Sequence, residues 1–320
     1  MKYYKFFITI LFCFCFFEKY TIYNIFKKKT IKVALCTMGK KENLYAQQFM
    51  EYYIRLGVDH MFIYDNNDPY TENIIDVMDT KYKDKISFYK TKKYNIYNQK
   101  EAFTHCYMNN LKKFDFFIMV DMDEYLYIIN DSLKNYLNNQ IFEKCDFIKI
   151  HWANSQDNNL LHYDSRPLFQ RFKRPYIKSK YIKTIIRGNI TKLKYWVHSP
   201  YISPDRNITC DNEGNIIKYT NMNFQSINKI NTNKAYLIHF RFKSTEEFIN
   251  KYKRGYSNWH RNNTNKILLD IIIRIKSSFQ FIILYINFNF IVIFFQANLP
   301  FIIYIEFYQT NLSNYKTIKL

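Results

Sequence analysis

The sequence predicts an α/β domain whose mixed, mostly parallel sheet is flanked by helices. Two observations support this fold class. Between residues 31 and 262, which we take as the domain, short apolar runs of strand length alternate with stretches of helical periodicity, an order typical of parallel sheets. Residues 114–120 are also apolar at nearly every position, as expected for a central strand buried on both faces.

The first part of the domain divides into clear elements. Residues 31–36 are expected to form the first strand, and apolar positions from 45 to 56 recur at helical spacing. Gly57 lies where the left-handed residue that ends a helix belongs. Residues 60–64 form the expected second strand, which the turn formers at 65–69 end.

The later elements follow from the same patterns. Residues 86–89 predict a short third strand, and a helix over 98–113 leads into the central strand. Further strands are expected at residues 146–152 and 235–238. Ser244 and Glu247 form a capping box, which predicts a helix starting at Thr245.

The net charge of +20, from 47 Lys and Arg against 27 Asp and Glu, admits a nucleic-acid-binding protein as an alternative. The charge alone is weak support, because Lys, Asn, Ile, Tyr and Phe are abundant along the whole chain. Aromatic residues lie in apolar runs and are not interleaved with Lys and Arg, and no DNA- or RNA-binding signature is present. We therefore expect no nucleic-acid partner.

The cysteines show no C-x-x-C pair and no His spacing typical of a zinc site. We interpret them as free thiols, mostly buried. The six are Cys13, Cys15, Cys36, Cys106, Cys145 and Cys210.

Both ends of the chain are apolar. Residues 6–17 are uncharged but short of the roughly 20 needed to cross a bilayer, so residues 1–30 are interpreted as an apolar leader or a short signal anchor. Residues 263–320 form a hydrophobic tail with a candidate membrane segment at 279–295, although alternation at 287–290 is strand-like. We expect membrane association, with the secretory pathway and the cytoplasmic face of a membrane both left open.

Three acidic residues, Asp121, Asp123 and Glu124, follow the central strand directly. Carboxylates at this end of a strand lie in the crevice where α/β sheets bind ligands. Mg²⁺ and Mn²⁺ are held by one or two carboxylates together with phosphate oxygens. The sequence therefore predicts a metal–diphosphate site here.

A series of colinear motifs over residues 31–256 resembles family 2-like and family 92-like glycosyltransferases, which have the nucleotide-diphospho-sugar transferase (GT-A) fold. The matching residues include Lys41-Glu42-Asn43, Leu56-Gly57-Val58-Asp59-His60, Ile63-Tyr64-Asp65-Asn66, Gln99 with Ala102, His105 and Cys106, Val120-Asp121-Met122-Asp123-Glu124-Tyr125-Leu126, His151-Trp152, Asp157-Asn158-Asn159, Tyr163-Asp164-Ser165-Arg166-Pro167-Leu168, Lys183-Thr184-Ile185-Ile186-Arg187, His198, His239-Phe240, Lys243-Ser244 and Arg254-Gly255.

The resemblance implies a metal-dependent, inverting glycosyltransferase that uses Mn²⁺ or Mg²⁺. Its donor would be a nucleotide sugar, by analogy a UDP-sugar such as UDP-galactose, and its acceptor a glycan or glycoconjugate. A catalytically inactive membrane scaffold of the same fold is the alternative.

Site residues carry over by position. Asp65 and Asn66 would contact the uridine or ribose, Asp121 the ribose, the metal or metal-bound phosphate, and Asp123 the metal. His239 is expected to be a metal or diphosphate ligand, although a structural role is the alternative for a single histidine after a strand.

Two roles follow from chemistry and placement. Arg254, on the helix that starts at Thr245, is expected to reach phosphate. A carboxylate must also take the acceptor's proton, and we assign this role to Asp157, in the polar loop after residues 146–152, with Asp164 as a rival.

Overall fold

The structure is a computed structural model that describes residues 30–94, 96, 98–173, 176–195, 198–201, 208–217, 230–253, 281–286 and 289–294. The chain divides into two compact units. The first comprises Met1–Asn158 and Asp164–Lys243, and the second comprises Asn159–Tyr163 and Ser244–Leu320. Each is described by itself.

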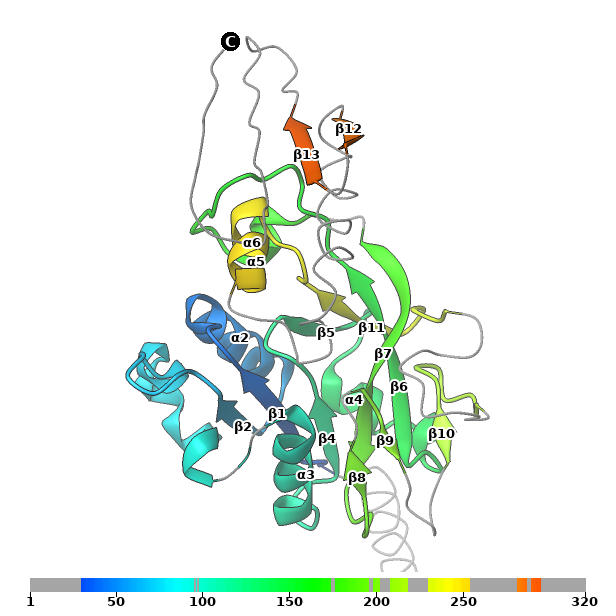
Figure 1. Ribbon diagram of the computed structural model, residues 1–320. Coiled ribbons are helices and arrows are strands. Elements are labelled where there is room, and N and C mark those ends of the chain that lie inside the picture. Colours follow the sequence, from blue (N-terminus) through cyan, green and yellow to red (C-terminus); the bar gives the residue numbers. More distant parts are fainter. Residues whose placement is uncertain are drawn as a thin grey trace, which may run out of the picture. The chain divides into compact units, whose positions relative to one another are not determined.

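The first unit is built on one mixed sheet (Figure 1), in the order β3-β2-β1-β4-β7-β6-β11-β5, with β10 paired to β6. The strands are β1 (Val33–Gly39), β2 (His60–Asp65), β3 (Ile86–Lys90), β4 (Phe116–Met119), β5 (Glu124–Ile128), β6 (Phe147–Asn154), β7 (Ile177–Arg187), β10 (Thr209–Cys210) and β11 (Ala235–His239). A separate two-stranded sheet pairs β8 (Lys194–Tyr195) with β9 (Pro200–Tyr201).

Strand direction places several strand ends along one edge. β1 is parallel to β2 and β4, and β2 is parallel to β3. β7 is antiparallel to β4 and β6, while β11 is parallel to β6 and antiparallel to β5. β1, β2, β3, β4, β6 and β11 therefore all end at the same edge, here called the carboxyl edge. A mixed α/β architecture with a mostly parallel core is confirmed.

The helices of the first unit are α2 (Asn43–Leu56), α3 (Gln99–Asn110), α4 (Leu133–Leu137) and α5 (Leu168–Arg171), with 3₁₀ turns η1 (Ile74–Val77), η2 (Thr80–Lys85), η3 (Thr91–Tyr94) and η4 (Gln140–Phe142). Gly57 ends α2 with φ of 107°, as predicted, and its N–H donates to the Ile54 carbonyl. Tyr53 attaches α2 to β5, because its hydroxyl donates to the Glu124 carbonyl (2.8 Å) and accepts the Leu126 N–H (3.0 Å).

Helix α3 covers the core beside β1 and β4. The Asn98 side chain caps it by accepting the Glu101 N–H. Phe103 and Tyr107 are fully buried against Phe117 and other core residues. The predicted helix at 98–113 and strand at 114–120 are therefore present in slightly shorter form.

The described residues contain two disulfide bonds, so the free-thiol prediction is wrong for four of the six cysteines. Cys36 on β1 pairs with Cys106 on α3, and Cys145 pairs with Cys210. The partners lie 70 and 65 positions apart, and only the folding of the sheet brings them together, which residue spacing does not reveal. Closing loops of this size stabilises a fold by about 4 kcal/mol each in the chain-entropy model.

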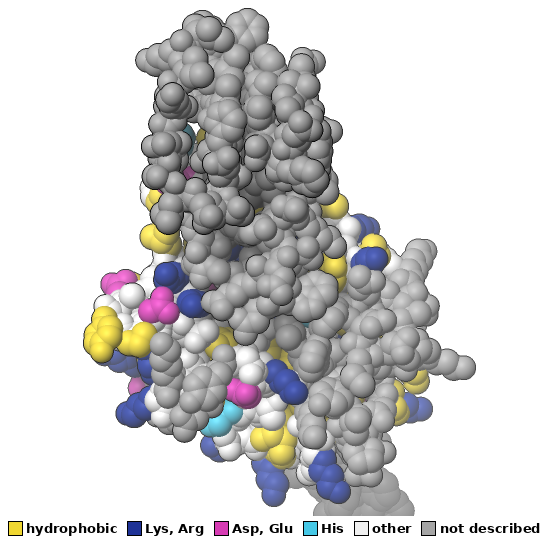
Figure 2. All heavy atoms as spheres, in the orientation of Figure 1, with side chains coloured by type: hydrophobic (Ala, Val, Ile, Leu, Met, Phe, Trp, Pro, Cys, Tyr) yellow, Lys and Arg dark blue, Asp and Glu magenta, His cyan; other side chains and the backbone are white. Residues whose placement is uncertain are grey.

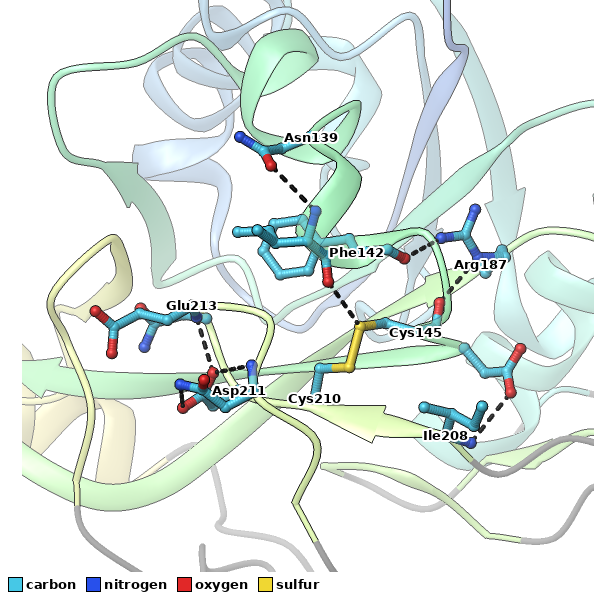
Figure 3. The surroundings of a disulfide bond; sticks show 12 residues. Asn139, Phe142, Cys145, Arg187, Ile208, Cys210, Asp211 and Glu213 are labelled. Carbon is cyan, nitrogen blue, oxygen red and sulfur yellow. Dashed lines mark hydrogen bonds between the residues drawn. A yellow bond between two sulfur atoms is a disulfide. The ribbon is translucent and has the colours of Figure 1, made fainter.

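The second disulfide fastens β10 to the start of β6 (Figure 3). Arg187 donates to the carbonyls of Cys145 and Phe142, and the Ile208 N–H donates to the carboxylate of Asp146. These contacts join β6, β7 and β10 at the end of the sheet opposite the carboxyl edge.

The second unit contains α6 (Thr245–Lys253). The predicted capping box is confirmed, since the Ser244 hydroxyl donates to the Glu247 carboxylate (2.7 Å) and accepts the Glu247 N–H (3.3 Å). The N–H groups of Thr245 and Glu246 donate to the carbonyls of Leu160 and Leu161, both at 2.9 Å.

The apolar segments at the ends of the chain are only partly described. Residues 6–17 lie outside the described residues. In the tail, β12 (Phe281–Ile286) and β13 (Asn289–Phe294) pair in antiparallel fashion, so the described part of the candidate membrane segment is strand and not helix. Within the described part of the chain, no helix combines the length and the apolar character needed to cross a bilayer.

Basic side chains are dispersed on the face drawn in Figure 2. Among the described residues of this face, Lys and Arg lie singly between acidic, apolar and other side chains.

Candidate active site

The predicted acidic residues form a closed turn at the carboxyl edge. β4 ends at Met119 and β5 begins at Glu124, so residues 121–124, here called the acidic turn, connect the two strands. The Glu124 N–H donates to the Asp121 carbonyl (3.0 Å), and the Asp121 N–H donates to Glu124 Oε2 (2.9 Å). These reciprocal hydrogen bonds fix the backbone that carries Asp123.

The structure places Asp123 and His239 side by side. His239 ends β11 opposite Glu124 on β5, and its Nε2 lies 3.5 Å from Asp123 Oδ2. Both side chains are 7% exposed. The Phe240 N–H donates to the Asp123 carbonyl (2.9 Å), and the Trp152 ring packs against the His239 imidazole with centroids 4.3 Å apart.

Asp121 is held by two side chains, Lys183 and Gln99, that have no expected role. Lys183 on β7 places its Nζ 3.0 Å from Asp121 Oδ1, and the Gln99 amide donates to the same oxygen. Lys183 Nζ also lies 3.8 Å from Glu124 Oε2. The Lys183 side chain is 1% exposed and that of Asp121 is 30% exposed.

The charges of this cluster depend on one another. Burial raises the pKa of Glu124 well above its usual range, and the nearby Asp121 charge raises it further, while Lys183 opposes both effects. Burial lowers the pKa of Lys183, but the charges of Asp121 and Glu124 outweigh burial, so the pKa lies above its ordinary value. Lys183 is therefore positively charged at neutral pH.

Asp65 and Asn66 lie at the carboxyl edge, where β2 ends beside β1. The Asp65 carboxylate is fully buried and accepts the N–H groups of Asn67 (2.7 Å) and Ile74 (3.2 Å) and the Lys90 ammonium (3.1 Å). It shapes the loop after β2. Asn66 is less buried, and its N–H donates to the Gly39 carbonyl (2.8 Å).

The remaining predicted site residues are Asp157, its rival Asp164, and Arg254. Asp157 is half-buried in the loop that follows β6. Its rival Asp164 is paired with Arg166, whose side-chain and backbone hydrogen bonds lower the pKa of Asp164 to about 2. Arg254 lies outside the described residues.

The described residues of this site offer few ligands to a metal ion. Among the described residues, no three His, Cys, Asp or Glu side chains are arranged to hold a metal ion by themselves. Asp123 and His239 offer one oxygen and one nitrogen at 3.5 Å. The pair would supply only part of a cation's ligands, and phosphate and water would have to supply the rest.

A second buried cluster lies nearby, between β6 and β7. Lys149 donates to the Thr184 hydroxyl (3.1 Å) and to the Ser199 hydroxyl, and burial lowers its pKa to about 7. The His198 Nδ1–H donates to the Ile182 carbonyl (3.0 Å). Burial, together with the Lys183 charge, lowers the pKa of His198 to about 2, so this imidazole stays neutral.

We expect Lys149→Met to stabilise the fold, and more so at pH 6 than at pH 9. Below pH 7 the buried Lys149 side chain is charged in the folded chain, and the full free-energy cost of burying that charge lowers the stability of the wild type. Between pH 7 and 10.5 the unfolded chain binds a proton that the folded chain does not, so wild-type stability rises with pH. Because the pKa of Lys149 is lowered to about 7, the increase in the free energy of unfolding caused by Lys149→Met should be larger at pH 6 than at pH 9 by roughly 2–3 kcal/mol.

Urea unfolding of both proteins at the two pH values measures this difference. Lys112→Met, which removes an exposed lysine, is the control. Equal gains for Lys149→Met at pH 6 and pH 9 would refute the assignment of a depressed pKa.

Comparison with known proteins gives two findings. The family model described as glycosyltransferase family 92 matches residues 29–272. A glycosyltransferase family 92 protein of Oryza sativa subsp. japonica is 28% identical over 119 residues, which cover 34% of this chain and 19% of the rice protein. The match therefore spans about a fifth of that relative's length.

Proposed function

Because the chain belongs to glycosyltransferase family 92, we propose that it transfers a sugar from a nucleotide-diphospho-sugar to a glycan or glycoconjugate, using Mn²⁺ or Mg²⁺, in a domain of the GT-A fold. The observation that carries this proposal is the acidic turn at the carboxyl edge, where Asp123 lies 3.5 Å from His239. Ligand sites of α/β sheets lie at this edge.

Asp123 and His239 would hold the proposed cation beside the donor diphosphate. When bound, it supplies positive charge that stabilises the departing nucleotide diphosphate. The Asp123 carboxylate supports this assignment, because carboxylate oxygens suit Mg²⁺ and Mn²⁺. Asp121, in the same acidic turn as Asp123, is proposed as a further contact to the metal or to phosphate.

For the donor nucleoside, Asn66 is the proposed direct contact. Since the Asp65 carboxylate is buried, we expect it to act through the loop that it holds, which carries Asn66. Arg254, beyond α6, is the proposed phosphate contact on the C-terminal side. A UDP-sugar, with UDP-galactose as an example, is the proposed donor.

The proposed reaction is a direct displacement with inversion. The acceptor oxygen forms a bond to the anomeric carbon while the bond from that carbon to the diphosphate oxygen breaks, and the diphosphate leaves with the electron pair. Asp157 is the proposed base that takes the acceptor's proton. Asp164 is a weaker candidate because Arg166 already holds its carboxylate.

We also propose that the domain works in an oxidising compartment, in association with a membrane. Disulfides persist in secretory and extracellular spaces and are rare in the cytosol. The bonds Cys36–Cys106 and Cys145–Cys210 therefore favour the secretory pathway over the cytoplasmic face of a membrane. The apolar residues 6–17 and the tail support the membrane association.

The function is tested by incubating the full-length chain with single UDP-sugars and a glycan mixture, and measuring UDP release and product mass. We expect release with at least one donor in Mn²⁺ and none in EDTA. A folded chain that releases no nucleotide from any donor tested would favour the inactive-scaffold alternative.

A further inference from the structure

The two carboxylate oxygens of Asp121 have different environments. Oδ1 receives both the Lys183 ammonium and the Gln99 amide. Within the described residues, Oδ2 has no hydrogen-bond or ion-pair partner, and the Asp121 side chain is 30% exposed. One carboxylate oxygen of Asp121 is therefore bonded within the protein, and the other is available to a ligand.

Lys183 cannot itself reach a ligand, because its side chain is only 1% exposed. It lies under the acidic turn and spans its two ends, at 3.0 Å from Asp121 and 3.8 Å from Glu124. An ammonium group has three donors, which allows both contacts at once. Its position fixes the orientation of the Asp121 carboxylate relative to the turn.

We propose that Lys183 and Gln99 are positioning residues that orient Asp121 so that its free oxygen, Oδ2, faces the cation–diphosphate part of the donor. The inference rests on the proposed function and adds to it two residues that act through Asp121. Residues of this kind fix the geometry of the groups that bind a metal, and their loss typically weakens metal affinity by about 10–100-fold.

A purely structural role for Lys183 would be to neutralise the buried Glu124. Two observations favour the positioning role. Lys183 is closer to Asp121 than to Glu124, and Gln99, which is uncharged and contributes nothing to neutralising Glu124, converges on the same Asp121 oxygen.

The test measures Mn²⁺ binding in the presence of UDP on the full-length chain, from the electron paramagnetic resonance signal of free Mn²⁺. Lys183→Met alone leaves Glu124 buried without its cation and is expected to unfold readily. The double variant Lys183→Met/Glu124→Gln removes both charges and keeps the fold testable. Gln99→Leu perturbs Asp121 without changing any charge, and Lys149→Met is the matched control for a buried lysine on the neighbouring strand.

We expect Gln99→Leu and the double variant to weaken Mn²⁺ binding by about tenfold or more, with melting curves that show folded protein, while Lys149→Met binds as the wild type does. Wild-type affinity in the folded double variant and in Gln99→Leu would overturn the inference and leave the proposed function standing. If the wild-type chain binds no Mn²⁺ with UDP, the proposed function fails, and the positioning role fails with it.

Discussion

Asp123→Asn is expected to lower sugar transfer by roughly a hundredfold to a thousandfold, the scale on which enzymes lose rate when one preorganised charge-stabilising group is removed. Asparagine keeps the size of the side chain and leaves the backbone hydrogen bond from Phe240 to the Asp123 carbonyl in place. The fold should therefore survive while the negative charge beside His239 is lost. UDP release at saturating Mn²⁺ measures the effect.

Asp84→Asn is a matched control, because it makes the same change at an exposed position in η2. Its turnover should equal that of the wild type. If Asp123→Asn retains both the wild-type melting curve and wild-type turnover, the assignment of a cation to Asp123 is wrong.

Replacement of both Cys36 and Cys106 by alanine is expected to reduce the free energy of unfolding by about 4 kcal/mol. The bond closes a loop across 70 positions, and in the chain-entropy model its loss frees the unfolded chain by that amount. Guanidinium unfolding under non-reducing conditions, against the wild type, measures the difference.

The same prediction has a chemical control. Thiol labelling of the denatured, non-reduced wild-type chain should leave Cys36, Cys106, Cys145 and Cys210 unmodified. Labelling of Cys36 and Cys106, together with an unfolding midpoint unchanged by the double substitution, would contradict the bond and remove one support for an oxidising compartment.

Local elements of the fold were predictable because their signals lie within a few residues. Gly57 ends α2 and Ser244 caps α6 as the sequence indicated. The sequence did not predict β7 because lysines interrupt its apolar pattern. Three of them, Lys178, Lys180 and Lys183, lie in this strand.

Strand order depends on contacts between distant residues. β4 pairs with β7 through residues about 70 positions further along the chain, as in Phe116 with Arg187, and no local pattern encodes that pairing. The disulfides were missed for the same reason, since neither pair has a diagnostic spacing.

The candidate site was predictable to the extent that carboxylates after a buried strand mark a ligand-binding edge. That rule located Asp121 and Asp123, and the resemblance added His239, which β11 places beside Asp123. Lys183 was not predicted to take part, because a lysine in a polar strand usually faces solvent. Only the sheet order shows that it lies beneath the acidic turn.

The most direct test of the central claim is isothermal titration of the full-length chain with UDP, in Mn²⁺ and in EDTA. The proposed cation site at Asp123 and His239 predicts saturable UDP binding that is strong in Mn²⁺ and weak or absent in EDTA. A folded chain that binds no UDP, or that binds it equally well without metal, would contradict a metal-dependent sugar transferase.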